Sequence, residues 1–132
     1  MSDAGVDTAY RELNRLAASV AERSVGVLAA SDQITDQDDL KMLEWISASI
    51  ILLRDLAGQG NAALLQDRPH RHAIRNCLNA IKGGALLLIE GAPDNGLDPS
   101  GAAAREAEAM VTHSDAILAC LDEVRQGVGH GV

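Results

Sequence analysis

Hydrophobic residues recur along most of the chain at three- and four-residue steps, the spacing that places them on one side of an α-helix. The pattern predicts four amphipathic helices, at about residues 7–29, 38–57, 67–90 and 102–126. Strands favour aromatic and β-branched residues, and this chain has one Trp, one Tyr and no Phe. The sequence therefore predicts an all-α protein whose four helices pack as a bundle.

The ends of these helices carry their own signals. Acidic residues at 36–39 are N-cap candidates for the second helix, and Asp67 with Pro69 in the first turn favours a fresh start for the third. In the second helix, Trp45 and Leu52 widen the apolar face beyond one stripe. We therefore expect this helix to be covered on more than one side.

Composition narrows the class of protein. The formal net charge of −8 argues against general nucleic-acid binding, which requires basic residues to neutralise phosphates. No apolar run approaches the roughly 20 residues of a membrane span, and the N-terminus lacks a secretory signal. Cys77 and Cys120 both fall on apolar stripes without metal-ligand spacing, which favours two reduced core thiols. We expect a cytoplasmic protein with no membrane partner, no metal site and no cofactor of its own.

The charges are unevenly placed along this acidic chain. Residues 68–89 contain no Asp or Glu, whereas four basic residues fall there: Arg68, Arg71, Arg75 and Lys82. A locally basic segment in a protein of negative net charge favours an anionic partner or ligand for the third helix.

Residues of the third helix separate into two faces when placed at about 100° per residue. The buried stripe is predicted to contain Ile74, Cys77, Leu78, Ile81, Ala85 and Leu88. The opposite face is predicted to present His72, Asn76, Asn79 and Gly83, with Arg75 and Lys82 flanking it. A neutral, exposed imidazole offers a nitrogen nucleophile, Asn76 can orient a ring or a phosphoryl oxygen, and Gly83 leaves room for a partner backbone.

The segment from His72 to Gly83, HAIRNCLNAIKG, resembles the H-box of the dimerisation and histidine phosphotransfer (DHp) domain of two-component histidine kinases. The resemblance extends over about residues 68–126, because a return helix with Ser114, Ile117 and Leu121 follows a modest loop. Two positions depart from the family pattern: Ala73 replaces the usual acidic residue, and Cys77 replaces the common proline.

The resemblance implies a site and partners. It makes His72 the phosphoacceptor, with Arg75, Asn76, Asn79, Lys82 and Gly83 orienting it or docking a partner. The partner would be the receiver domain of a response regulator, which supplies the Mg²⁺, or a histidine kinase. It also implies a homodimer through the third and fourth helices, in which the helical hairpin forms a four-helix bundle with that of a second chain and each chain has two additional N-terminal helices. The four helices of one chain could instead close a bundle alone. The chain would divide into an N-terminal segment of two helices (1–66), the DHp-like hairpin (67–126) and a flexible tail (127–132).

Three functions remain open at this level. The first is a phosphorelay protein that exchanges a phosphoryl group with a receiver aspartate. Too few residues follow the hairpin for an ATP-binding kinase domain, so this protein would not phosphorylate itself from ATP, and whether it is an enzyme stays open. The second is a non-catalytic DHp-like protein that binds or inhibits a kinase or receiver. The third is a regulatory helical domain in which His72 is an ordinary surface histidine.

Overall fold

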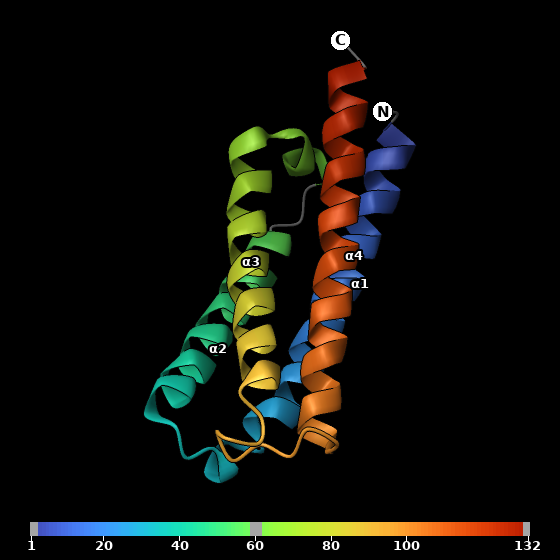
Figure 1. The fold of residues 1–132 in the computed structure, drawn as a ribbon. Coiled ribbons are helices and arrows are strands. Elements are labelled where there is room, and N and C mark those ends of the chain that lie inside the picture. Colours follow the sequence, from blue (N-terminus) through green and yellow to red (C-terminus); the bar gives the residue numbers. More distant parts are fainter. Residues whose placement is uncertain (1–2, 59–61, 131–132) are drawn as a thin grey trace.

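The protein is a bundle of four antiparallel-packed helices, as the hydrophobic pattern predicted (Figure 1). The computed structural model describes residues 3–58 and 62–130, and no strand occurs within them. The long helices are α1 (Asp3–Leu28), α2 (Gln37–Ala57), α3 (Arg68–Glu90) and α4 (Ala102–His130). Two short 3₁₀ segments, Ser31–Gln33 and Ala62–Gln66, lie between them.

The helices contact one another in a ring. α1 packs against α2 and, most extensively, against α4, while α3 packs against both α2 and α4. One hydrophobic core runs through all four helices, and its largest fully buried side chains include Leu13, Val20, Leu53, Ile74, Leu78, Ile81, Met110, Ile117 and Leu121. The apolar faces of α3 and α4 are therefore covered by α1 and α2 of the same chain.

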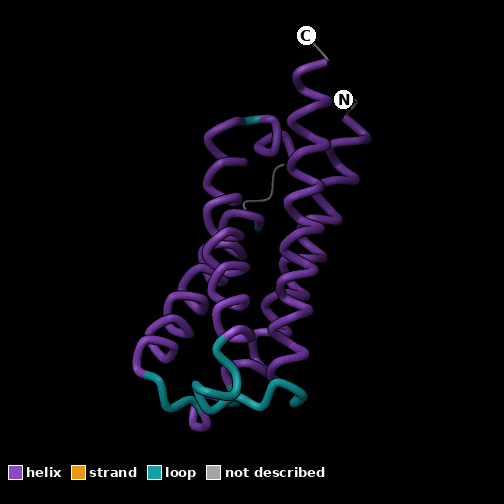
Figure 2. The backbone as a smooth tube through the Cα atoms, in the orientation of Figure 1, coloured by secondary structure: helices purple, strands orange, loops and turns teal. Residues whose placement is uncertain are grey.

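The lower end of the bundle is closed by the loop that follows α3, which crosses the α1–α2 connection (Figure 2). Asn95 is buried there; its amide donates to the Asp39 carboxylate at 2.8 Å and to the Leu88 carbonyl at 3.1 Å. The next residue, Gly96, has φ +93°, and a Cβ at this position would lie 2.0 Å from the Gln33 carbonyl oxygen. This crossing ties the end of α3 to the start of α2.

The capping interactions predicted from the sequence form at the start of α2 but not at the start of α3. The Asp36 carboxylate accepts hydrogen bonds from the N–H groups of Asp38 (2.9 Å) and Asp39 (3.1 Å), as expected for an N-cap. Asp67 lies at the N-cap position of α3 but its side chain makes no capping hydrogen bond. Pro69 does fall in the first turn, where its missing N–H costs nothing.

Two expectations were wrong. The chain was expected to leave the helix at 127, yet α4 continues to His130, because glycine only weakens a helix that already has a hydrogen-bonded ladder to extend. α2 was expected to be covered on more than one side, yet Trp45 and Leu52 are 61% and 50% exposed. Only the face of α2 that carries Leu43, Ile46, Ile50 and Leu53 is buried, so periodicity located the core face and overestimated its width.

Candidate functional site

α3 has the two faces that its sequence predicted. The six residues of the predicted apolar stripe are all buried. On the opposite face His72, Asn76 and Asn79 are exposed, and a Cβ at Gly83 would have no atom within 4 Å. The helix therefore holds an exposed imidazole on a rigid, well-packed support.

The two cations that flank this face are paired with carboxylates of α4. Arg75 Nη2 lies 2.7 Å from Asp122 Oδ1, and Lys82 Nζ lies 2.6 Å from Asp115 Oδ1. All four side chains are partly exposed, so each pair contributes little to stability, about 0–1 kcal/mol. Their charges are largely balanced by α4, which the sequence of α3 alone did not indicate.

The pairs also define how α4 lies against α3. In each pair the two residue numbers sum to 197. Because α3 and α4 are antiparallel, other residues whose numbers have this sum also lie at the same height along the two helices. The same register places Arg125 of α4 level with His72 of α3. This arginine was not among the residues that the sequence singled out, because nothing local in α4 indicates which residue of α3 it faces.

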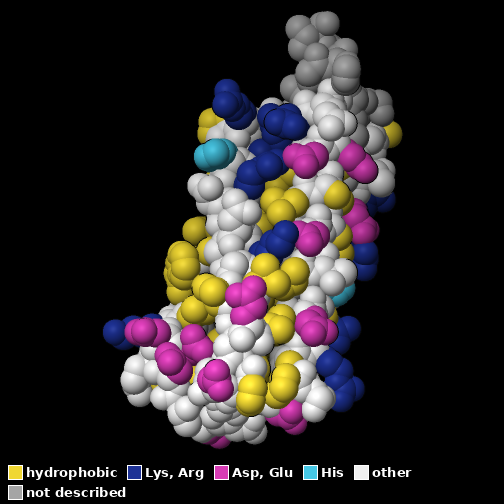
Figure 3. Space-filling view, in the orientation of Figure 1, with side chains coloured by type: hydrophobic (Ala, Val, Ile, Leu, Met, Phe, Trp, Pro, Cys, Tyr) yellow, Lys and Arg dark blue, Asp and Glu magenta, His cyan; other side chains and the backbone are white. Residues whose placement is uncertain are grey.

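A hollow of about 460 Å³ opens beside the imidazole, and its lining residues are Arg68, Arg71, His72, Arg75 and Arg125. Arg68 and Arg125 are exposed, whereas Arg71 is 8% exposed and donates from Nη1 to the Leu65 carbonyl at 2.8 Å. Figure 3 shows basic side chains gathered near a histidine at the upper end of α3 and α4. The hollow is suited to an anion with several oxygen atoms, since arginine donates in the fork geometry that phosphate accepts.

A second hollow of about 380 Å³ lies on the other side of the imidazole. It is lined by Arg68, Pro69, His72, Ala73 and Asn76, so His72 and Arg68 border both hollows. None of the lining residues of either hollow is acidic. Chemically, the site can bind an anion beside a nitrogen nucleophile. The Asp122 carboxylate, which lines neither hollow, is held by Arg75.

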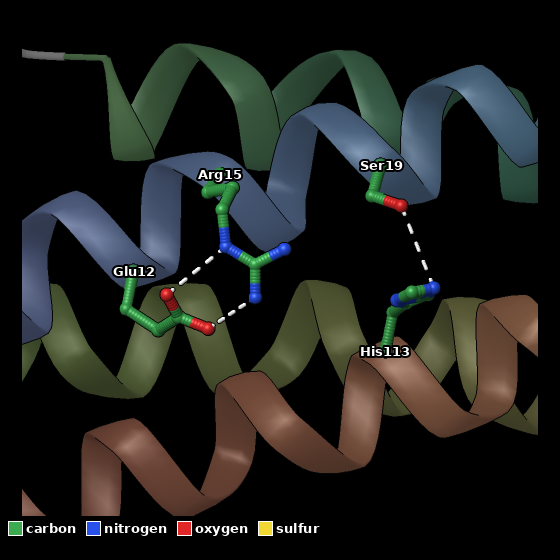
Figure 4. A network of polar contacts seen from close by, with 4 residues as sticks. All are labelled: Glu12, Arg15, Ser19 and His113. Atoms are coloured by element: carbon green, nitrogen blue, oxygen red, sulfur yellow. Dashed lines mark hydrogen bonds and ion pairs between the residues drawn. The ribbon is translucent and has the colours of Figure 1, made fainter.

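His113 has a different environment, between α1 and α4 (Figure 4). Its Nε2 lies 3.4 Å from Ser19 Oγ, and Arg15 on the same face of α1 pairs with Glu12. Burial lowers the pKa of His113, and the charges of Arg23 and Arg15 lower it further. This histidine is part of the packing between α1 and α4.

The remaining residues also include ones with metal-binding or thiol chemistry. In residues 3–58 and 62–130, no group of three or more His, Cys, Asp or Glu side chains could hold a metal ion. Cys77 and Cys120 are free, and burial raises the pKa of both thiols, which makes them poor nucleophiles.

Comparison of the chain with protein-family models, with curated proteins and with solved structures finds no match. Across the described helices, none is both long enough and apolar enough to cross a bilayer. The functional interpretation therefore depends on the geometry of the His72 site and on the resemblance of its sequence to the H-box.

Proposed function

We propose that this protein carries a phosphoryl group on His72 and exchanges it with the aspartate of a response-regulator receiver domain. The observation that supports this function best is the position of the exposed imidazole at the edge of a hollow lined by four arginines. Arg75 is balanced by Asp122, but Arg68, Arg71 and Arg125 form no ion pair among the described residues, so a phosphoryl group on His72 would extend toward positive charge, and Arg125 would approach it from α4. Asn76 and Asn79 on the same exposed face would orient the group or contact the partner.

The transfer step uses the imidazole as a nucleophile. An unprotonated ring nitrogen of His72 attacks the phosphorus of the aspartyl phosphate, a P–N bond forms and the acyl P–O bond breaks. The receiver carboxylate leaves with the bonding electrons, and the phosphorylated ring releases its remaining N–H proton to water. The Mg²⁺ that neutralises the phosphoryl oxygens belongs to the receiver domain, and the reverse reaction follows the same path.

A phosphotransfer assay tests this function. A receiver domain loaded with labelled phosphate is mixed with the protein, and the label on the protein is tested for lability to acid and stability to alkali. His72→Ala should abolish the label, while His70→Ala, two residues away, should retain it. Because His72 is exposed, its removal should leave the fold intact, which circular dichroism verifies. Label that survives His72→Ala would refute the assignment.

Arg125 gives a second, independent test of the same site. Arg125→Ala should slow transfer about tenfold, since it removes one charged donor from the hollow. The matched control is Arg11→Ala, which removes an exposed arginine of α1 and should leave the rate unchanged. The wild-type rate should also fall as salt is added, because the charges that attract the acidic receiver are partly exposed.

The second candidate function is a non-catalytic protein that binds or inhibits a histidine kinase or a receiver. The absence of a carboxylate from the lining of both hollows favours it, because Ala73 stands where the DHp family has its acidic residue. In that case His72→Ala would leave partner binding unchanged, as measured by titration calorimetry, and no label would transfer. Labelling of the wild type on His72 therefore distinguishes the two functions, because only the first predicts it. The predicted homodimer stays a prediction under both functions, and the face of α3 and α4 that it would use is covered by α1 and α2 of the same chain.

A further inference from the structure

The outer face of α2 carries a stripe of residues that no described part of the chain covers. Its members follow one another at steps of four, three, four and three residues, and all are exposed: Lys41, Trp45, Ala48, Leu52 and Asp55. This alternation has a mean period of about 3.5 residues, which is the spacing of a helix that packs along another helix in a coiled coil. Here it lies on the side that faces away from the bundle core.

The stripe is apolar in the middle and charged at its ends. Trp45 and Leu52 are 61% and 50% exposed, and the neighbouring Ile51 is 71% exposed. Figure 3 shows hydrophobic side chains gathered at the left edge of the molecule, over α2. In the part of the chain that the structure describes, neither Lys41 nor Asp55 forms an ion pair. Large apolar side chains clustered on a surface commonly mark an interface.

The stripe is complementary to itself when two copies run antiparallel. With Ala48 at the twofold axis, Lys41 of one copy faces Asp55 of the other, and Trp45 faces Ile51 with Leu52 directly beside it. The small side chain of Ala48 at the centre lets the two helices approach closely. A parallel arrangement would instead place Lys41 against Lys41 and Asp55 against Asp55, so the charges favour the antiparallel one.

We propose that this stripe is a homodimer interface, in which α2 pairs antiparallel with α2 of a second copy of this chain. The stripe spans 15 residues, about 21 Å of helix, and a twofold axis makes every contact occur twice. The α3–α4 surface through which DHp-like hairpins would dimerise is not open here, since α1 and α2 cover it. The interface does not depend on the chemistry of His72.

Sedimentation velocity over about 1 to 200 µM protein tests the proposal, and the tryptophan emission provides a local probe because Trp45 is the one tryptophan of the chain. The wild type should dimerise as concentration rises, and the emission should shift to shorter wavelength as the indole leaves water. Leu52→Glu should weaken the dimer more than about a hundredfold, because two carboxylates would enter the apolar centre. Val25→Glu is the matched control, a charge at an apolar position of α1 that is 66% exposed, and should leave the dimer unchanged.

Charge reversal tests the antiparallel register separately. Lys41→Asp and Asp55→Lys should each weaken the dimer about tenfold, because each creates two like-charge contacts, and the double variant should restore it. A wild-type chain that stays monomeric at the highest concentration overturns the proposal, as does a dimer that tolerates Leu52→Glu. If the single reversals weaken the dimer and the double variant does not restore it, the antiparallel pairing is wrong. Because His72 is untouched in every variant, failure here is distinguishable from failure of phosphotransfer.

Discussion

Two adjacent glycines in α3 provide a sharp test of the packing. At Gly83 an added Cβ would have no atom within 4 Å, whereas at Gly84 it would lie 2.7 Å from both Cδ1 and Cγ1 of Ile46. The Ile46 side chain is 2% exposed and cannot swing into solvent. The substitutions Gly83→Ala and Gly84→Ala therefore make the same chemical change at two adjacent positions of one helix turn, one open and one packed against α2.

The difference between the two variants isolates the packing contribution. Replacing a glycine by alanine inside a helix gains about 1 kcal/mol of free energy of folding, and both variants share that gain. Gly83→Ala should therefore be more stable than the wild type by up to about 1 kcal/mol. The free energy of unfolding of Gly84→Ala should be about 1–3 kcal/mol lower than that of Gly83→Ala. This difference is the usual cost of adding a methyl group to a filled core.

Urea denaturation followed by far-ultraviolet circular dichroism measures both free energies of unfolding, provided that the slopes with denaturant agree. Equal stability of the two variants would refute the close contact between α2 and α3 at Gly84. Gly83→Ala also tests the exposed face of α3. The methyl group should leave the receiver-dependent label on His72 intact unless the partner backbone approaches at this glycine.

Three further predictions concern stability. Asn95→Ala should lower the free energy of unfolding by about 2–4 kcal/mol, because it leaves Asp39 and two backbone groups without hydrogen bonds at a buried position; urea denaturation checks this. Ser114→Ala should raise the melting temperature slightly, since the Ser114 hydroxyl is fully buried without a partner and alanine suits the helix better. For His113 the pKa in the folded state lies below the usual 6.5, so the folded state binds fewer protons than the unfolded state near that pH. The free energy of unfolding should therefore fall as the pH drops from above 6.5 toward the lower pKa. His113→Gln should flatten this part of the stability–pH curve, and an unchanged slope would contradict the burial argument.

The faces of α3 could be predicted from the sequence because they depend only on local geometry. Once a segment is helical, its 3.6-residue period fixes which side chains lie together, and the six apolar residues of α3 allow a single buried side. The exposure of His72 follows from the same rule. The helix boundaries were also close, since glycine and proline interrupt the pattern after α2 and after α3, and acidic N-cap candidates mark the start of α2.

Contacts between helices could not be predicted in this way. The position of Arg125 beside His72 depends on the register of α4 against α3, which is set by packing and by the Arg75–Asp122 and Lys82–Asp115 pairs. The exposure of Trp45 likewise depends on which neighbours reach α2. Hydrophobicity alone does not distinguish a side chain buried within the chain from one that is available to another copy of it.

Under the proposed function, His72 carries a phosphoryl group that it neither makes nor removes. Hydrolysis of a phosphohistidine requires a water molecule to be oriented and deprotonated, and no acidic side chain lines either hollow beside the ring. The arginines that do line the larger hollow would stabilise the charge of a phosphoryl group without activating water. Under the proposed function, the replacement of the family's acidic residue by Ala73 then has a physical consequence: the group stays on His72 until a receiver aspartate accepts it.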